Sequence, residues 1–372
     1  MPVGSFLVHA TEGEARVGEL ITAHGSFQTP AFMPVCTQAA AKGLAPSRLR
    51  EVGVEILLCN AYHLHVRPGE ELIRDLGGIH KFMAWDGPIL TDSGGYQVFS
   101  LSKLRKVSEA GVVFNSHVDG APIEFTPEKV LKIQEDLGVD IMMVLDECPP
   151  FPSEKDALLA SLQRTLRWAR RCKEAKSKQS ALLFGIVQGG IYEDLRQQSI
   201  DELINIGFDG YAIGGVSVGE SSELIERATR FSAPRLPRDK VRYLMGVGTP
   251  ADIVMAVSCG VDMFDCVMPT RSARFGRVFV GSGHINIRNS AFRRDPRPLS
   301  DKCECYTCRN FSRAYLAHLV HSEEVLAVEL LTTHNVYFYQ CLMQDIRRAI
   351  RAGDFHSFSN DFLMGVSCEQ AH

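Results

Sequence analysis

No stretch of the sequence approaches the roughly 20 consecutive apolar residues that a membrane-spanning helix requires. The first residues, MPVGSFLVHATEGEAR, lack the basic start and the apolar run of a secretory signal. Low-complexity segments and linkers between independent domains are also missing. We therefore expect a cytoplasmic protein with no membrane partner, whose 11 cysteines are thiols or metal ligands rather than disulfides.

An overall positive charge is absent as well, because the net charge is −4. The segment from Arg271 to Arg313 differs from the rest, since it holds ten Lys or Arg residues against three acids. A basic zone on an otherwise acidic chain suits a polyanionic partner that is steered to one face. A solvated basic face with no partner is the alternative interpretation.

Eight short apolar runs recur along the chain, and amphipathic stretches with helical spacing separate them. Repeated alternation of strands and helices predicts an α/β fold of the (β/α)8 TIM barrel type, with a doubly wound sheet as the alternative. We expect residues 1–372 to form a single domain. The predicted strands are Pro30–Val35, Val54–Cys59, Ile89–Thr91, Asp140–Leu145, Leu182–Val187, Gly210–Ile213, Arg242–Gly246 and Val261–Val267.

Three segments do not follow this alternation of strands and helices. Residues 5–28 alternate between apolar and polar side chains, which predicts an N-terminal hairpin that plugs one end of the barrel. Residues 106–125 predict an inserted antiparallel hairpin with Asp119 and Gly120 in its turn. Residues 295–345 contain a small cysteine-rich unit embedded in the domain.

Polar residues and glycines follow most of the predicted strands, and a barrel gathers such positions at its catalytic mouth. Carboxylates, an amide and backbone N–H groups match the hydrogen-bonding edge of a purine-like base, and Tyr96 and Met245 could hold its ring between them. Two further carboxylates could divide nucleophilic and acid/base work at a glycosidic carbon. Helix caps, simple chain turns or a phosphate cradle are the alternatives. The residues are Asp92, Ser93, Asp146, Glu147, Gln188, Gly214, Gly215, Gly246, Gly248 and Asp265.

The run GVDMFDCVMPTRSARFGR places a carboxylate next to three arginines. Pro269 offers no N–H to a sheet, so we expect the last strand to end near it and Asp265 to lie close to its carboxyl end. Arg271 and Arg274 follow, with Arg277 at the same spacing of three. A carboxylate in this place can act as a nucleophile, and arginine side chains bind phosphates. The alternative is a capping aspartate among solvated arginines.

Cys303, Cys305 and Cys308 form a C-x-C-x-x-C motif, the most specific local signal in the chain. Three thiolates so close together can share one tetrahedral metal ion, and structural zinc is favoured over an iron–sulfur cluster or free thiols. The spacing leaves the fourth ligand open among His318, His321, His334 and Cys341.

Taken in order, several motifs resemble the bacterial-type tRNA-guanine transglycosylases, and the resemblance covers essentially the whole chain. These motifs are TDSGGYQVFSL, LDEC, GIVQGG, YAIGGVSVGE, LMGVG, FDCVMPTRS and C-x-C-x-x-C followed by a histidine. The family is a zinc-containing (β/α)8 barrel and is typically homodimeric. It exchanges guanine at the wobble position of tRNAs with GUN anticodons (Asp, Asn, His and Tyr) for a 7-deazaguanine, within queuosine biosynthesis.

The resemblance implies a role for each matching residue. Asp265 is expected to be the nucleophile and Asp92 the general acid/base, while Arg271 and Arg274 contact nucleotides next to the target. His334 is implied as the fourth ligand of one structural zinc ion per subunit. The residues implied in binding guanine and the incoming base are Asp92, Ser93, Tyr96, Asp146, Cys148, Gln188, Gly215, Val216, Val218, Glu220 and Met245.

The choice of incoming base is expected to depend on the loop after Gly215. The Val216 carbonyl could accept a hydrogen bond from the aminomethyl group of 7-aminomethyl-7-deazaguanine (preQ1), with Glu220 steadying that peptide. Val218 stands where enzymes that use queuine resemble one another in having glycine. We therefore expect preQ1 as the substrate, with salvaged queuine as the alternative.

Overall fold

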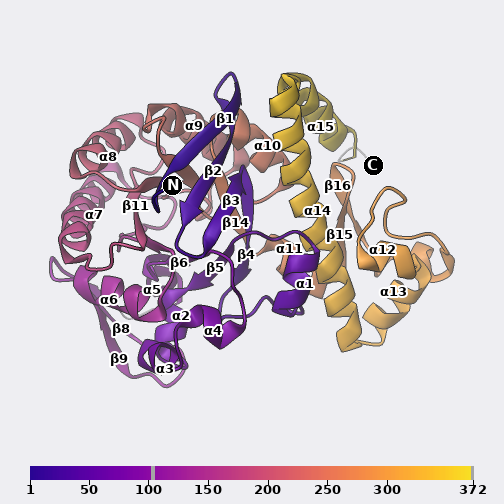
Figure 1. Cartoon of the computed structure of the whole chain (residues 1–372), viewed down its shortest axis with the longest axis horizontal. Coiled ribbons are helices and arrows are strands. Elements are labelled where there is room, and N and C mark those ends of the chain that lie inside the picture. The colour runs from indigo at the N-terminus through magenta and orange to yellow at the C-terminus, as the bar shows by residue number, and fades with distance from the viewer. Residues whose placement is uncertain (102–104, 370–372) are drawn as a thin grey trace.

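Eight parallel strands close into a barrel in a computed structural model that describes residues 1–101 and 105–369 (Figure 1). The predicted (β/α)8 fold is confirmed. Around the barrel, β14 pairs with β4 and β6 pairs with β10, so that no strand is left at an edge. Most strand residues are buried, which explains their continuous apolar runs. The strands are β4 (Ala31–Cys36), β5 (Leu57–Asn60), β6 (Ile89–Asp92), β10 (Ile141–Met143), β11 (Leu182–Val187), β12 (Gly210–Ile213), β13 (Val241–Leu244) and β14 (Met263–Cys266).

Helices surround the barrel where the amphipathic stretches predict them. Hydroxyl side chains cap several of their N-termini: Thr126 accepts a hydrogen bond from the Lys129 N–H, and Thr249 does the same for Asp252. The helices up to the last barrel strand are α1 (Pro46–Glu51), α2 (Ala61–Val66), α3 (Glu70–Asp75), α4 (Ile79–Met83), α5 (Gly95–Leu101), α6 (Pro127–Leu137), α7 (Lys155–Ala175), α8 (Glu193–Ile206), α9 (Ser222–Ser232), the 3-10 helix η1 (Ala233–Arg235) and α10 (Pro250–Ser258). No helix in the described ranges is both long and apolar enough to cross a membrane.

The N-terminal segment forms a three-stranded antiparallel sheet, one strand more than the predicted hairpin. Its strands are β1 (Phe6–Glu12), β2 (Ala15–Thr22) and β3 (Gly25–Thr29), and β3 leads directly into the first barrel strand. Arg16 of β2 donates two hydrogen bonds to Asp262, which lies just before β14. His24 contacts Asp140, which lies just before β10. The sheet therefore lies against the amino ends of the barrel strands.

The inserted segment also gains a strand relative to the prediction. Its strands are β7 (Arg105–Val107), β8 (Val112–Asn115) and β9 (Pro122–Phe125), and Asp119 and Gly120 lie in the turn between the last two. Gly120 has a φ of 74°, a left-handed conformation that glycine adopts without strain. The third strand forms because the segment before residue 108 turns back onto β8.

The chain after the last barrel strand forms a separate small core beside the barrel, on the right of Figure 1. Val267 is the N-cap residue of the next helix and Pro269 lies in the first turn of that helix, so the last barrel strand ends at Cys266, before the predicted Val267. The long helix α14 returns to pack on β4 and α11. The elements are α11 (Met268–Arg274), β15 (Arg277–Val280), β16 (Gly283–Asn286), the 3-10 helix η2 (Ser290–Arg294), α12 (Tyr306–Asn310), α13 (Arg313–His321), α14 (Val325–Ala352) and α15 (Phe355–Glu369).

Asp140 is a buried carboxylate that joins the N-terminal sheet to the barrel. Its oxygens accept hydrogen bonds from the backbone N–H groups of Ile89 and His24, and they lie 3.0 Å from ring nitrogens of His24 and His80. Burial alone would raise its pKa, but these hydrogen bonds, led by that of His80, hold the pKa of Asp140 below its ordinary value of 3.8.

We expect Asp140→Asn to lower the free energy of unfolding at pH 7 by about 1–3 kcal/mol, because buried donors lose a charged acceptor. A depressed pKa stabilises the fold above the unfolded value, and this stabilisation is lost as the pH falls through the folded value. Urea denaturation should therefore show the variant and the unmodified protein converging toward pH 3. The exposed Asp75→Asn is the control, and a difference that stays constant between pH 7 and pH 3 would contradict the assignment.

Candidate active site

A cavity of about 950 Å³ lies at the carboxyl ends of the barrel strands, opposite the N-terminal sheet. Glu147, Glu220 and Arg274 are the residues expected at this mouth that do not line it, and Glu147 pairs with Arg164 instead. One cavity therefore brings together predicted residues from Asp92 to Arg271, which are 179 positions apart in the sequence. The predicted residues in its wall are Asp92, Ser93, Tyr96, Asp146, Cys148, Gln188, Gly215, Val216, Val218, Met245, Asp265 and Arg271.

Asp265 presents a carboxylate with one oxygen engaged and one left open. Oδ1 accepts hydrogen bonds from the Tyr243 hydroxyl (2.5 Å) and the Gly246 N–H (2.8 Å). Within the described residues, Oδ2 accepts no hydrogen bond. Burial raises the pKa of Asp265 and these two donors oppose the rise, while burial keeps Tyr243 protonated by raising its pKa well above 10. The carboxylate is thus oriented through one oxygen and free to react through the other.

Asp92, the last residue of β6, is held through both oxygens. Oδ1 accepts from the N–H groups of Ala61 (3.1 Å) and Gly94 (3.2 Å), and Oδ2 accepts from the side-chain amides of Asn60 and Gln97. Burial raises its pKa to about 6 despite these donors, and the negative charge of Asp265 adds to the rise. A carboxyl group with this pKa can take up and release a proton near neutral pH.

A third carboxylate, Asp146, lies with two polar side chains in the same wall. Its Oδ2 accepts a hydrogen bond from Gln188 Nε2 (2.7 Å), and its Oδ1 lies 3.4 Å from the Ser93 hydroxyl. Burial raises the pKa of Asp146 to about 6. The three residues are at most 6 % exposed, so they form a prearranged set of donors and acceptors next to the cavity.

The glycine loops beside this set allow close approach of Gln188. Gly215 has a φ of +61°, and a Cβ there would come within 2.4 Å of Gln188 Oε1. Arg196 of α8 holds the loops from behind, because it donates to the carbonyl oxygens of Gly190 (2.6 Å) and Gly214 (3.2 Å). Arg196 is fully buried and was absent from the sequence prediction, since an arginine in an amphipathic helix usually lies in solvent.

Glu220 has a different backbone partner from the one expected. Its carboxylate accepts a hydrogen bond from the Val218 N–H at 2.7 Å, two residues beyond the Val216 peptide that we expected it to steady. Val216 and Val218 both line the cavity. The loop therefore places the Val218 side chain in the cavity wall and leaves the Glu220 carboxylate outside it.

Three predicted residues contribute apolar or soft surface. Tyr96 of α5 is 51 % exposed at the cavity mouth, and Met245 is half-buried after β13. Cys148 is buried, and burial raises the pKa of its thiol, so it stays neutral.

Arg271 of α11 is exposed at the rim, while Arg274 lies on the same helix outside the cavity wall.

Asn60 and Tyr243 are further residues of the cavity that sequence reasoning missed. Asn60 is the last residue of β5, so the rule for strand ends would have found it. Tyr243 lies inside β13 and carries no signal of its own in the sequence, because strand tyrosines are common in cores.

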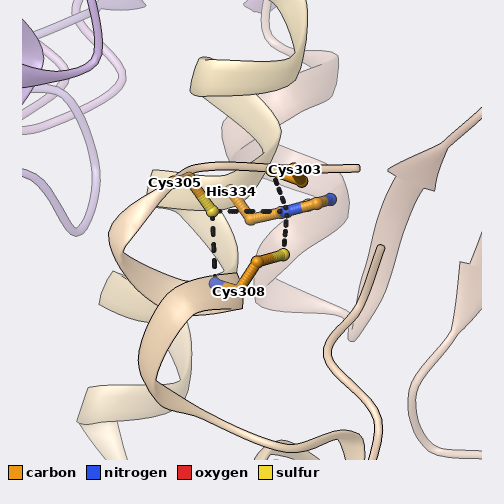
Figure 2. A group of neighbouring side chains, drawn as sticks. All are labelled: Cys303, Cys305, Cys308 and His334. Carbon is orange, nitrogen blue, oxygen red and sulfur yellow. Dashed lines mark hydrogen bonds between the residues drawn. The ribbon is translucent and has the colours of Figure 1, made fainter. Parts of the chain in front are cut away.

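Cys303, Cys305, Cys308 and His334 converge in the small C-terminal core, where their ligand atoms could hold a metal ion (Figure 2). The three sulfur atoms lie 3.6, 3.6 and 3.3 Å from His334 Nδ1. His334 Nε2 lies 2.7 Å from the Phe279 carbonyl, which requires the proton on Nε2 and leaves the Nδ1 lone pair for a metal. Of the four candidates for the fourth ligand, His334 is the one in the cluster.

A closed barrel with buried carboxylates and glycine loops at the carboxyl ends of its strands belongs to the class of (β/α)8-barrel enzymes. A model of the queuine tRNA-ribosyltransferase family matches residues 11–367. The protein named queuine tRNA-ribosyltransferase from Halothermothrix orenii is 53 % identical over 349 residues, or 94 % of each chain. The one from Nitrosomonas eutropha is 54 % identical over 357 residues, covering 96 % of this chain and 99 % of that one. The chain belongs to the queuine tRNA-ribosyltransferase family.

Proposed function

We propose that the protein exchanges the wobble guanine of tRNAs with GUN anticodons for preQ1. As a member of its family the chain is a pentosyltransferase that acts on tRNA. The observation that carries the proposal is the placement of Asp265, with its open Oδ2, in one cavity with the Asp146, Gln188 and Ser93 set. A nucleophile for the sugar and a hydrogen-bonding edge for the base are thus within the reach of a single nucleotide.

The exchange divides into two displacements at the ribose C1′. Asp265 Oδ2 attacks C1′, the bond to guanine breaks, and Asp92 donates the proton that the departing base needs. The incoming base then loses a proton to the Asp92 carboxylate and attacks C1′, which releases Asp265. Two inversions keep the base on the original face of the sugar, as in retaining glycosidases.

The same cavity explains how both bases could be recognised. Asp146 and Gln188 offer acceptor and donor groups to the pyrimidine edge of guanine, and the Gly215 backbone adds a further polar contact. Tyr96 and Met245 would contact the faces of the ring, and Ser93 and Cys148, which line the same cavity, would contact the base as well. An anticodon-loop base must leave its stack to reach this depth, which single-stranded loops permit. Arg271 and Arg274 would bind phosphates next to it.

The metal in the cysteine cluster is proposed to be zinc. A tetrahedron with metal–sulfur bonds of about 2.3 Å and a metal–nitrogen bond of about 2.0–2.1 Å has sulfur–nitrogen edges of about 3.6 Å. The observed separations of 3.3–3.6 Å fit that geometry. When bound, zinc supplies a structural crosslink rather than chemistry, because the cluster lies outside the active-site cavity. From the family resemblance we also propose that the protein is a homodimer in the cytoplasm.

Incorporation of radiolabelled guanine into anticodon stem-loops tests the reaction directly. We expect label to enter a GUN stem-loop and to be displaced by unlabelled preQ1. A stem-loop with adenine at the wobble position is the control. Absence of exchange into the GUN loop would overturn the proposed function.

We expect Val218→Gly to raise the ratio of kcat/KM for queuine to that for preQ1 by at least about 10-fold. PreQ1 ends at its aminomethyl group, whereas queuine continues into a cyclopentenediol ring. Val218 lines the cavity as part of the loop after Gly215, where that ring would have to fit. Val218→Ala should give an intermediate ratio. Competition kinetics with both bases provide the measurement, and equal use of the two bases by the unmodified enzyme would contradict the preQ1 assignment.

A further inference from the structure

Phe275 is an apolar side chain in an unusual place. It follows α11 at the cavity mouth, and its side chain is 63 % exposed, the largest value for an aromatic residue whose side chain the structure describes. Phe279, four residues later, is 5 % exposed and stacks against Phe338 in the core. The sequence therefore places one ring of this segment inside the protein and leaves the other in water beside the active site.

The charged residues around Phe275 are all positive. Arg271, Arg274 and Arg277 are exposed, and none of them forms an ion pair with any described residue. Some exposed arginines elsewhere in the molecule are paired, as Arg167 is with Glu109, whereas Arg288, Arg293 and Arg294 extend the unpaired positive charge along the chain. Arg271 and Arg277 line the same cavity as Phe275. The mouth thus combines an uncovered ring with two uncompensated positive charges, and Arg274 adds a third on α11 outside the cavity wall.

This combination matches the way in which proteins bind single-stranded nucleic acid. Unpaired cations follow the phosphates, and an aromatic face stacks on a base whose neighbours no longer cover it. Extracting one nucleotide from an anticodon loop uncovers such faces on the bases beside it. A phenyl ring has no polar group that would select among bases, so the contact tolerates any base at that position.

We propose that Phe275 is a stacking platform for one of the two bases that flank the exchanged nucleotide, while Arg271, Arg274 and Arg277 bind the adjoining phosphates. This inference rests on the proposed function, because it requires an anticodon loop whose target base enters the cavity. Stacking would hold the neighbouring base away from the extracted one and so keep the target in place for attack by Asp265.

The test compares RNA binding by the unmodified protein and by Phe275→Ala with three stem-loops. One is intact, one is abasic on the 5′ side of the target, and one is abasic on the 3′ side. We expect Phe275→Ala to raise the Kd for the intact loop by about 5- to 150-fold. The abasic loop that lacks the stacked base should bind the unmodified protein with a Kd that is raised by a similar factor. Phe275→Ala should raise the Kd for that loop no further. Phe275→Tyr should restore binding of the intact loop.

Several controls separate stacking from a general effect. Phe82→Ala, which removes another exposed phenylalanine on α4, should leave the Kd unchanged. The KM for free guanine and the melting temperature should be the same for Phe275→Ala as for the unmodified protein. The salt dependence of binding should also stay the same, whereas Arg274→Ala should reduce its slope by about one.

Equal weakening of all three loops by Phe275→Ala, or no weakening of the intact loop, would overturn the stacking assignment alone. Failure of the unmodified protein to exchange guanine into the intact loop would overturn the proposed function and the stacking assignment with it. The exchange assay therefore tells the two failures apart.

Discussion

Asp265→Asn is expected to abolish base exchange, with a fall in kcat of about 10⁴-fold or more. The amide is nearly the same size as the carboxylate, and its oxygen can still accept the hydrogen bonds from Tyr243 and Gly246. The cavity should therefore keep its shape. What is lost is the negative oxygen that attacks C1′, because a neutral amide is a poor nucleophile toward a sugar carbon.

Trapping of a covalent protein–RNA adduct measures this prediction. The unmodified protein, mixed with a GUN stem-loop and no incoming base, should give a species that survives denaturing electrophoresis. Asp265→Asn should bind the RNA with an unchanged Kd and give no such species. Asp239→Asn, an exposed carboxylate before β13, is the matched control and should trap normally. Trapping by Asp265→Asn at the level of the unmodified protein would assign the nucleophile elsewhere.

The barrel could be predicted from the sequence because each of its strands is buried and so reads as an apolar run. β11 illustrates this, since all six of its residues are buried and its bounds, Leu182–Val187, match the predicted ones. The same rule placed Asp92 and Asp265 at the carboxyl ends of their strands. Periodicity and strand ends are local properties of the sequence. They can be recognised without knowing which distant residues each strand contacts in the fold.

Partners distant in sequence could not be predicted in this way. Arg196 is buried because three glycine carbonyl groups from two other loops converge on its side chain, which nothing in the helix around it signals. The pairing of Tyr243 with Asp265 depends on two neighbouring strands being in register. The additional strands β3 and β7 likewise exist because they pair with β2 and β8, and these pairings depend on how the chain turns back.

The metal cluster is connected to the active site through the residue next to one of its ligands. Asn335, which follows His334 in α14, donates hydrogen bonds to the carbonyl oxygens of Pro269 and Arg277. Pro269 belongs to α11, the helix that carries Arg271. A metal ion that fixes His334 would therefore also support the segment whose arginines we propose to bind RNA.

Cys305→Ser is expected to lower the metal content from one ion per chain toward zero and the melting temperature by about 5–10 °C. Metal binding contributes directly to folding where the ligands come from separate segments, as here from the loop before α12, from α12 itself and from α14. Each kcal/mol lost corresponds to about 2–4 °C in a domain of a few hundred residues. Because Asn335 ties α14 to α11, the Kd for a stem-loop RNA should rise as well.

Metal analysis, thermal melting and RNA binding together decide this prediction, with Cys341→Ser as the control. Cys341 is half-buried two turns after His334 in the same helix but lies outside the cluster, so its loss should change none of the three measurements. If the Cys305→Ser protein retained one metal ion per chain, the cluster would not be the metal site. If it lost the metal but melted and bound RNA as the unmodified protein does, the ion would not support α14 and α11, and the structural role would be wrong.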